Sequence, residues 1–269
     1  MQPKSNNISP FNRDTYQDMN AWFGTPLGEK LLATERRIVD SMLSRRFGYH
    51  LLQLGCAELL LHDSSPMGHK FSLCAFQETS TRHSAIARGE EIPLRSESVD
   101  LVLLHHALDF SDQQHQLLRE VSRILIAGGH VVIVGFNPIS SWGIRNKLLW
   151  WKRQKAPWHA SLLGTLRLTD WLKLLDFQVE QIKYGCYTLP VNSPAVIRYS
   201  SFLESLANRL NWPTGGIYAI VARKQVIPVT PIQQQRRHLH MHGLGLPISD
   251  KISQASRNIH EASNEEHGQ

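Results

Sequence analysis

With 269 residues, 42% of them hydrophobic, the chain has the size and composition of one globular domain with a large apolar core. No stretch approaches the roughly 20 apolar residues of a membrane-spanning helix, and neither the polar N-terminus nor the three cysteines indicate secretion, so a cytoplasmic protein is predicted. The formal net charge of +6 comes mainly from one stretch, because residues 137–169 contain six Lys or Arg and no acidic residue.

The first third of the chain is predicted to contain a flexible end, one long helix and three short strands. Residues 1–20 are polar and are expected to be flexible, ahead of a folded domain at residues 21–228. Residues 22–46 carry apolar side chains on one face and charged ones, Glu35 among them, on the other, which predicts an amphipathic helix. Strands are expected at residues 50–54, 71–76 and, more weakly, 84–87.

The most informative segment is residues 92–138. The apolar run from Val99 to Leu104 predicts a strand covered on both faces, and the helical spacing of apolar residues from Leu117 to Leu125 predicts a crossover helix. The pair Gly128-Gly129 is expected to end that helix before a second strand at residues 130–136. Such a unit is typical of doubly wound α/β folds, which bind ligands at the carboxyl ends of their strands.

Residues 142–158 combine Trp side chains with Lys and Arg. This composition is compatible with a lid over an apolar substrate, a membrane-surface helix or a nucleic-acid contact, and the simplest alternative is a solvated helix packed on the core. The first two are favoured over nucleic acid, because the charges of the tail balance and give no second basic region.

The last third is predicted to contain two further strands, at residues 178–184 and 217–224, and an amphipathic helix at 196–210. Residues 229–269 are rich in Gln, His, Ser and Asn, which predicts a disordered tail. Three alternating histidines in this tail could chelate a metal ion, but they have no Cys or carboxylate nearby, so no metal site is predicted: His238, His240 and His242.

The segments IPLRSESVD and LLREVSRILIAGGHVVIV resemble class I S-adenosylmethionine-dependent methyltransferases, specifically the UbiE-like or type 11 branch. The residues that match are Ile92, Pro93, Ser98, Asp100, Glu120, Arg123, Leu125, Gly128 and Gly129. The segment GFNPIS, at residues 135–140, is similar to a YafS-like proteobacterial family. The resemblance extends from about residue 21 to residue 231 and implies a Rossmann-like, doubly wound sheet of seven strands, mostly parallel, whose last strand is antiparallel.

In this family the cofactor lies against a loop that reads approximately L-D-x-G-C-G-x-G. The corresponding segment here is LLQLGCAEL, in which a glycine and a cysteine match, Gln replaces the acidic residue, and Ala and Leu replace two glycines. Glycines serve at such a loop because they let a ligand approach the backbone. The resemblance therefore implies a cofactor site, for S-adenosylmethionine, formed by Gln53, Gly55, Cys56, Ala57, Phe76, Gln77, Gly89, Glu90 and His105.

Two histidines, His105 and His106, follow the fourth predicted strand, where this fold places groups that face cofactor and substrate. Neighbouring strand residues point to opposite faces, so at most one of the two is expected to face the cleft. Either could orient a substrate or act as a general base, and the alternative is a hydrogen-bonded structural histidine.

The resemblance implies methyl transfer from S-adenosylmethionine to a small or lipophilic acceptor. Two alternatives stay open, namely a catalytically silent methyltransferase-fold protein that binds a partner, and a nucleic-acid methyltransferase that uses the basic residues 145–155. A serine hydrolase and a nicotinamide dehydrogenase are disfavoured, because the chain has neither a G-x-S-x-G elbow nor a G-x-G-x-x-G loop.

Overall fold

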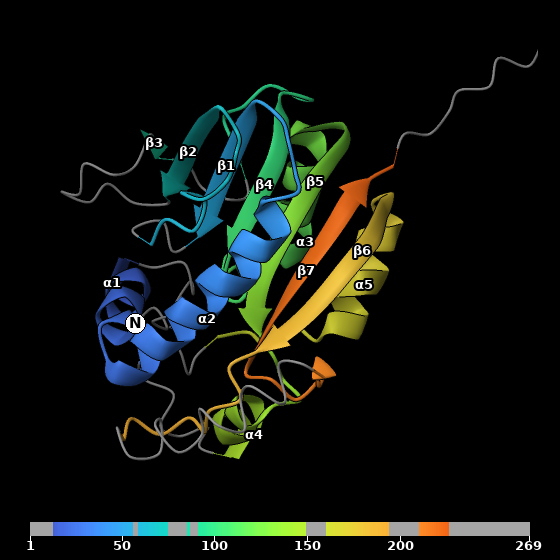
Figure 1. Cartoon of the computed structure of the whole chain (residues 1–269). Helices are drawn as coiled ribbons and strands as arrows, with labels where there is room; N and C mark the ends of the chain where they lie inside the picture. Colours follow the sequence, from blue (N-terminus) through green and yellow to red (C-terminus); the bar gives the residue numbers. More distant parts are fainter. Residues whose placement is uncertain are drawn as a thin grey trace, which may run out of the picture. The chain divides into compact units, whose positions relative to one another are not determined.

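In the described part of the chain, seven strands form one sheet in the order β3-β2-β1-β4-β5-β7-β6 (Figure 1). All neighbouring strands are parallel except that β7 is antiparallel to both β5 and β6, which confirms the predicted fold class. The strands are β1 (His50–Gly55), β2 (His69–Cys74), β3 (Ala85–Ile86), β4 (Val99–His105), β5 (Leu125–Phe136), β6 (Phe177–Gly185) and β7 (Ile217–Lys224).

The computed structural model describes residues 13–55, 59–74, 85–86, 91–148, 160–193 and 210–225. The chain divides into two units, Met1–Ile227 and Pro228–Gln269. The predicted tail and the predicted helix at residues 196–210 lie outside the described residues, apart from Leu210. Within the described part, no helix has both the length and the hydropathy that crossing a membrane requires.

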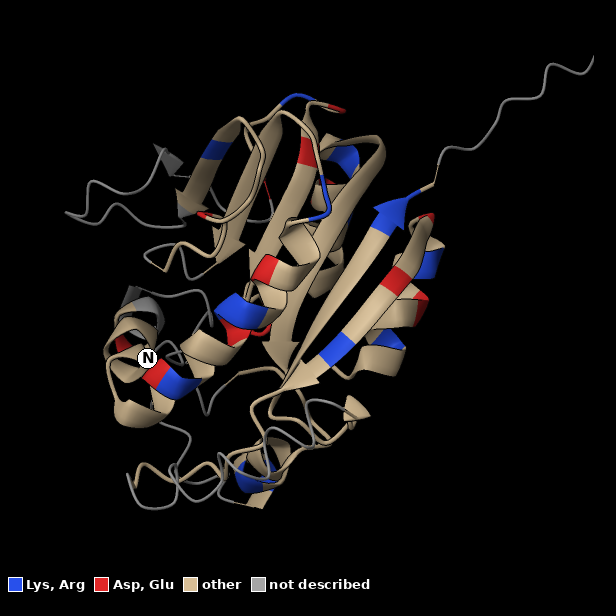
Figure 2. Cartoon of the chain, in the orientation of Figure 1, with Lys and Arg blue, Asp and Glu red and all other residues tan. Residues whose placement is uncertain are grey.

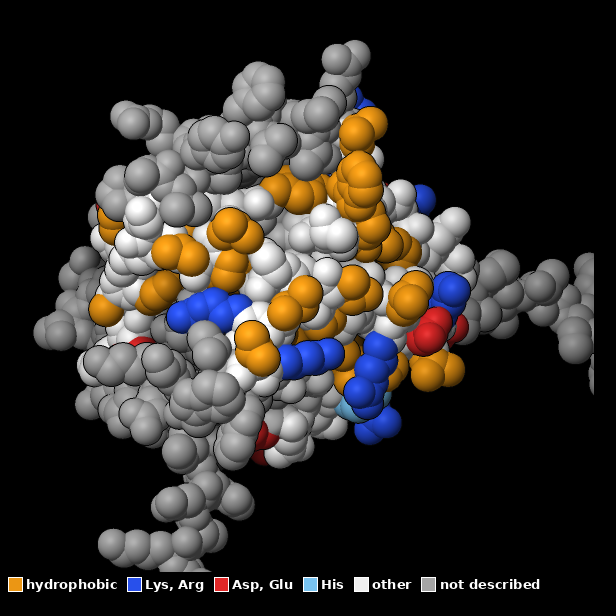
Figure 3. Space-filling model, turned by 90° about the horizontal axis from the view of Figure 1, so that it is seen from below, with side chains coloured by type: hydrophobic (Ala, Val, Ile, Leu, Met, Phe, Trp, Pro, Cys, Tyr) orange, Lys and Arg blue, Asp and Glu red, His pale blue; other side chains and the backbone are white. Residues whose placement is uncertain are grey.

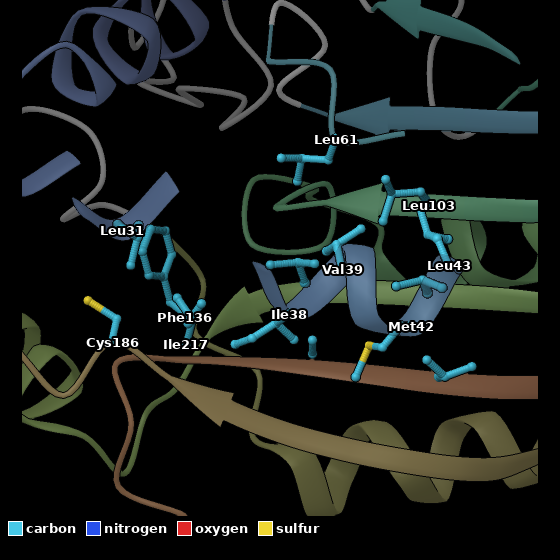
Figure 4. Packing of buried hydrophobic residues seen from close by; sticks show 14 of the residues in the cluster. Leu31, Ile38, Val39, Met42, Leu43, Leu61, Leu103, Phe136, Cys186 and Ile217 are labelled. Carbon is cyan, nitrogen blue, oxygen red and sulfur yellow. The ribbon is translucent and has the colours of Figure 1, made fainter. Parts of the chain in front are cut away.

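Helices cover both faces of the sheet (Figure 1). The helices of the described residues are α1 (Arg13–Phe23), α2 (Pro26–Leu43), α3 (Gln114–Ile124), α4 (Ser141–Leu148) and α5 (Thr165–Leu174). Of these, α2 lies on one face of the sheet, and α3 and α5 lie on the other. Because side chains alternate along a strand, β4 sends Leu101 and Leu103 into the cluster under α2, and Val102 and Leu104 into the cluster under α3 and α5. Figure 4 shows the first cluster, where side chains of α2 lie against the sheet.

The helix predicted at residues 22–46 is in fact two helices. Thr25 interrupts it, because its hydroxyl accepts a hydrogen bond from the backbone N–H of Gly28 at 3.2 Å and Pro26 begins α2. The two helices approach so closely that a Cβ on Gly28 would lie 2.3 Å from the carbonyl oxygen of Trp22. Helix α1 also occupies part of the segment expected to be flexible, and its Met19 is buried.

The pair Gly128-Gly129 lies within β5 and does not end the preceding helix, which already stops at Ile124. Gly128 has a φ of +79°, and the register of the β4–β5 pair shifts between Val99 and Leu101. A Cβ on Gly129 would lie 3.0 Å from the backbone oxygen of Asp100. The glycines therefore permit an irregular, close strand pairing rather than a helix cap.

A charged pair on α3 fastens the segment that precedes β4. Arg123 donates to the backbone oxygens of Ile92 and Leu94, at 2.9 Å each, while Glu120 accepts from the same guanidinium at 2.8 Å. These two residues belong to the family resemblance, and their geometry gives them a structural role.

Candidate active site

The strands β1 and β4 meet at Gly55 and His105, which are paired in the parallel register. Gly55 has a φ of +109°, and a Cβ there would lie 2.0 Å from the carbonyl oxygen of His105. Only glycine fits both the conformation and the space. The chain runs from β1 outward to β3 and from β4 outward to β5, so this junction is the switch point where doubly wound sheets bind ligands.

Gln53, which stands where the family has an acidic residue, is fully buried. Its side-chain amide donates to the carbonyl oxygen of Leu59 at 2.9 Å, and its side-chain oxygen accepts from the N–H of Leu61 at 3.0 Å. The side chain thus ties the loop that follows β1 to the strand itself.

The other predicted cofactor-binding residues are not among those that the structure describes. Their assignment stays a prediction for Cys56, Ala57, Phe76, Gln77, Gly89 and Glu90.

His105 and His106 both reach one carboxylate, that of Glu35 on α2. Nε2 of His105 lies 2.9 Å from one oxygen of Glu35, and Nε2 of His106 lies 2.8 Å from the other. The opposite ring nitrogen of His106 lies 2.8 Å from a carboxylate oxygen of Asp109. All four side chains are fully buried, and we call them the histidine cluster.

The expectation that the two histidines point to opposite faces is therefore wrong. His105 is the last residue of β4, and His106 adopts a φ of +53°, so strand alternation stops between them. The backbone N–H of His106 still donates to the carbonyl oxygen of Val134 at 3.0 Å, which holds this turn against β5. The reversal brings both rings to the same side.

Contrary to the prediction, Glu35 does not lie on the solvent-facing side of its helix. It is 0% exposed. The available signal was its spacing: Glu35 lies four residues after Leu31 and four before Val39, which puts it in register with the apolar stripe of α2. A carboxylate in such a stripe needs a buried partner.

The charges in the histidine cluster depend on one another. Burial by itself disfavours the ionised form of Glu35, but attraction to His106 and His105 outweighs it and lowers the pKa of Glu35 to about 2. Burial likewise opposes protonation of His106, but the carboxylates of Glu35 and Asp109 raise its pKa to about 9. The pKa of Asp109 is raised, chiefly by burial, despite its bond to His106.

The surroundings of the cluster are aromatic. The ring of Phe136 stacks on His106 with centroids 4.2 Å apart, and Phe23 of α1 lies 5.8 Å from the ring of His105. Asp109 also accepts from the N–H of Phe136 at 2.9 Å through one oxygen. Its second oxygen is buried and has no hydrogen-bond partner in the described part of the chain.

The segment GFNPIS forms the turn that follows β5. Asn137 donates to the carbonyl oxygens of Pro213 and Gly215, at 2.8 Å each, and Ser140 accepts from the N–H of Gly143 at the start of α4. Trp142 of α4 is buried and donates to the carbonyl oxygen of Thr188 at 2.8 Å. The turn thus fixes α4 at the carboxyl end of the sheet.

The face around α4 is apolar and basic (Figure 3). Helix α4 carries Arg145 and Lys147 in its last turn. Large apolar side chains are also exposed on this helix and on the neighbouring loops, namely Ile139, Ile144, Leu148, Leu189, Val191 and Trp212. Residues 149–159, the rest of the predicted lid or membrane segment, lie outside the described residues.

A polar groove lies at the opposite end of the sheet, between α2 and β6. It has a volume of about 700 Å³ and is lined by Arg45, Arg46, Phe47, His130 and Glu180, among others. Figure 2 shows the charged residues of α2 and β6 on either side. Because this groove is far from the carboxyl ends of β1 and β4, it is not the ligand site that the fold predicts.

Comparison with known proteins connects this geometry with a group of enzymes. Residues 47–133 match a family described as "Methyltransferase domain". Over 220 residues the chain is 30% identical to the uncharacterized protein YafS of Escherichia coli K12, an alignment that covers 81% of this chain and 86% of YafS.

Solved structures with the same fold include S-adenosylmethionine-dependent methyltransferases from two bacteria. The one from Thermotoga maritima is 16% identical, with a TM-score of 0.57 over 78% of this chain and 95% of the other. The one from Mesorhizobium loti is 18% identical, with a TM-score of 0.50 over 70% and 96% of the two chains. At such identities the likeness concerns the fold.

Proposed function

The chain belongs to the family of YafS, and its residues 47–133 match a methyltransferase domain, so we propose that it transfers a methyl group from S-adenosylmethionine to a small or lipophilic acceptor. The observation that carries the proposal is the junction of Gly55 and His105 at the switch point of the sheet. There the backbone of β1 carries no side chain, as the family's cofactor loop requires.

The residues at this junction fit the cofactor. When bound, S-adenosylmethionine supplies an electrophilic methyl group on its sulfonium. Gln53 holds the loop after β1 through its bonds to Leu59 and Leu61, and the histidine cluster fixes the end of β4. Methyl transfer needs mainly in-line placement of donor and acceptor, so a rigid support without an exposed base is chemically sufficient.

The apolar and basic face around α4 supports a lipophilic acceptor. Ile144 and Leu148 are 61% and 66% exposed. Neighbouring exposed apolar side chains often mark a surface that binds a protein, a membrane or a ligand. The neighbouring basic side chains, with no acidic residue from 137 to 169, suit the anionic surface of a membrane. We therefore propose that this cytoplasmic enzyme takes its acceptor at a membrane surface, through residues 142–158.

Calorimetric titration with S-adenosylhomocysteine tests the cofactor assignment. We expect a dissociation constant in the tens of micromolar, roughly −6 kcal/mol, because the loop has lost glycines and acidic residues. Gly55→Ala should abolish binding, whereas Gly68→Ala, whose new Cβ would meet only Tyr49 at 3.6 Å, should leave it unchanged. Circular dichroism of both variants verifies that they fold.

The result also separates the alternatives. A wild-type protein that gives no heat and no thermal shift at millimolar ligand would favour a silent methyltransferase-fold binding protein. Cofactor binding together with RNA binding that weakens steeply with salt would favour a nucleic-acid methyltransferase.

A further inference from the structure

The histidine cluster contains a set of groups that the proposed reaction does not use as reactants. Two imidazoles and one carboxylate present nitrogen and oxygen atoms that all lie within 4.8 Å of one another. We propose that Glu35, His105 and His106 bind a divalent transition-metal ion. This inference goes beyond the proposed function and does not depend on cofactor binding.

The ligand set suits such an ion. Imidazole nitrogen and carboxylate oxygen are common ligands of zinc, iron and cobalt, and two histidines with one carboxylate is a recurrent set. The three groups come from two distant parts of the chain, Glu35 from α2 and the histidines from the end of β4. An ion between them would fasten the helix to the sheet beside Gly55.

Charge balance supports the same conclusion. The cluster buries two carboxylates, Glu35 and Asp109, and among the described residues their ion pairs are with His105 and His106 alone. A proton on one imidazole offsets one of these charges, whereas a divalent ion offsets both. The second oxygen of Asp109 is buried and has no hydrogen-bond partner in the described part of the chain, so the negative charge of this carboxylate is only partly compensated.

The outer contacts of His106 match those of a metal ligand. A metal-bound histidine usually donates its other ring N–H to a carboxylate, which fixes the ring, and here Asp109 lies 2.8 Å from Nδ1 of His106. Phe136 and Phe23 add an apolar shell. The left-handed backbone of His106, uncommon for a residue other than glycine, is what directs this ring into the cluster.

The competing explanation is a network of hydrogen bonds without metal. Each oxygen of Glu35 already faces one imidazole nitrogen at 2.8 or 2.9 Å, so protons alone could complete the network. The two explanations differ in metal content, which can be measured without any assay of methyl transfer.

The experiment uses the full chain with other histidines removed. His50 and His69 form an exposed pair with ring nitrogens 3.0 Å apart, and the tail has three alternating histidines, so either could bind metal adventitiously. The background variant therefore carries His50→Gln, His69→Gln, His238→Gln, His240→Gln and His242→Gln. After removal of metal with a chelator, it is dialysed against zinc or cobalt, and its metal content and cobalt absorption spectrum are measured.

We expect the background variant to retain about one equivalent of metal, with a cobalt spectrum of nitrogen and oxygen ligation. Glu35→Gln and His105→Gln should each lose it, whereas Glu29→Gln, on an exposed position of the same helix, should not. Asp109→Asn keeps an oxygen for His106 and Phe136 and should lower the affinity about 10-fold to 100-fold. If Glu35→Gln and His105→Gln fail to fold, the metal affinity of Asp109→Asn decides whether the histidine cluster is the metal site.

A background variant that retains no metal and shows no thermal shift with zinc or cobalt would overturn the inference. Retention that is equal in the background, Glu35→Gln and Asp109→Asn would also overturn it, because the metal would then lie elsewhere. Titration with S-adenosylhomocysteine on the same samples separates the two proposals, since binding of the cofactor without metal leaves the proposed function intact.

Discussion

A pair of histidines lies at each end of β1, and the two pairs differ in burial and in hydrogen-bond partners. At the start of the strand, the rings of His50 and His69 touch each other in an exposed position, and in the described part of the chain no carboxylate is bonded to either ring. At its end lie His105 and His106, fully buried and bonded to Glu35 and Asp109. The comparison shows that burial and neighbouring carboxylates, rather than the presence of two imidazoles, give the carboxyl end of this sheet its chemistry.

The largest effect is expected from breaking the buried pair at its carboxylate. Glu35→Ala leaves two imidazoles buried without the carboxylate that they share, and removal of one member of a buried ionic network costs about 3–5 kcal/mol. His50→Ala, at the exposed pair, should change stability by less than about 0.5 kcal/mol. Urea denaturation of both variants measures the difference. Equal free energies of unfolding for the two variants would show that the buried network stabilises the fold no more than the exposed pair does.

The surfaces at the two ends should differ in their affinity for lipid. Replacing Ile144 and Leu148 together with Ser removes two exposed apolar side chains from the face around α4 and should weaken binding to anionic vesicles by about 1.5–3 kcal/mol. Phe47→Ser, at the opposite end and 79% exposed, is the matched control and should have no effect. Vesicle sedimentation measures both. A wild-type protein that stays in the supernatant contradicts the membrane proposal.

The contribution of the basic side chains of α4 to vesicle binding should depend on the salt concentration. Arg145 and Lys147 lie on α4 in the basic stretch, and each cation near an anionic surface contributes about 1 kcal/mol. Neutralising both with Gln should weaken binding at low salt and have little effect at high salt, because ions screen the attraction. Binding that is equally weakened at both salt concentrations would show that these side chains act through packing.

The smallest effect concerns an ion pair on the solvent side of the sheet's amino end. The guanidinium of Arg123 lowers the pKa of Glu120 below its usual value of 4.5. A lowered pKa means that Glu120 stabilises the fold fully above pH 4.5 and loses that contribution as the pH falls through its folded-state value. Glu120→Gln should therefore lose stability at neutral pH, by less than about 1 kcal/mol, and match wild type in acid. Melting temperatures from pH 7 to pH 3 measure this.

The fold could be predicted from the sequence because its signals are local. Apolar runs such as Val131 to Phe136 can be buried only in a covered strand, and the seven-stranded, mostly parallel sheet with an antiparallel last strand follows from the resemblance. The break at Thr25 could also have been predicted, since Thr followed by Pro is a common start of a helix. The irregular pairing around Gly128 could not, because it depends on how closely β4 approaches β5.

The candidate site was predictable only in part. Gly55 and His105 were identified from motif and position, and they do meet. Glu35 was assigned to solvent, since charge usually decides that assignment and its partners lie 70 and 71 residues away in the sequence. The left-handed turn at His106 could not be predicted from its residue type, because histidine adopts a positive φ more often than most residues but still only rarely.

The amide of Asn137 couples two segments that lie far apart in the sequence. By holding the carbonyl oxygens of Pro213 and Gly215, it joins the exit from β5 to the entry into β7 across more than 70 residues of chain. The exit from β5 and the entry into β7 are therefore expected to open together, as one unit, when the fold is perturbed.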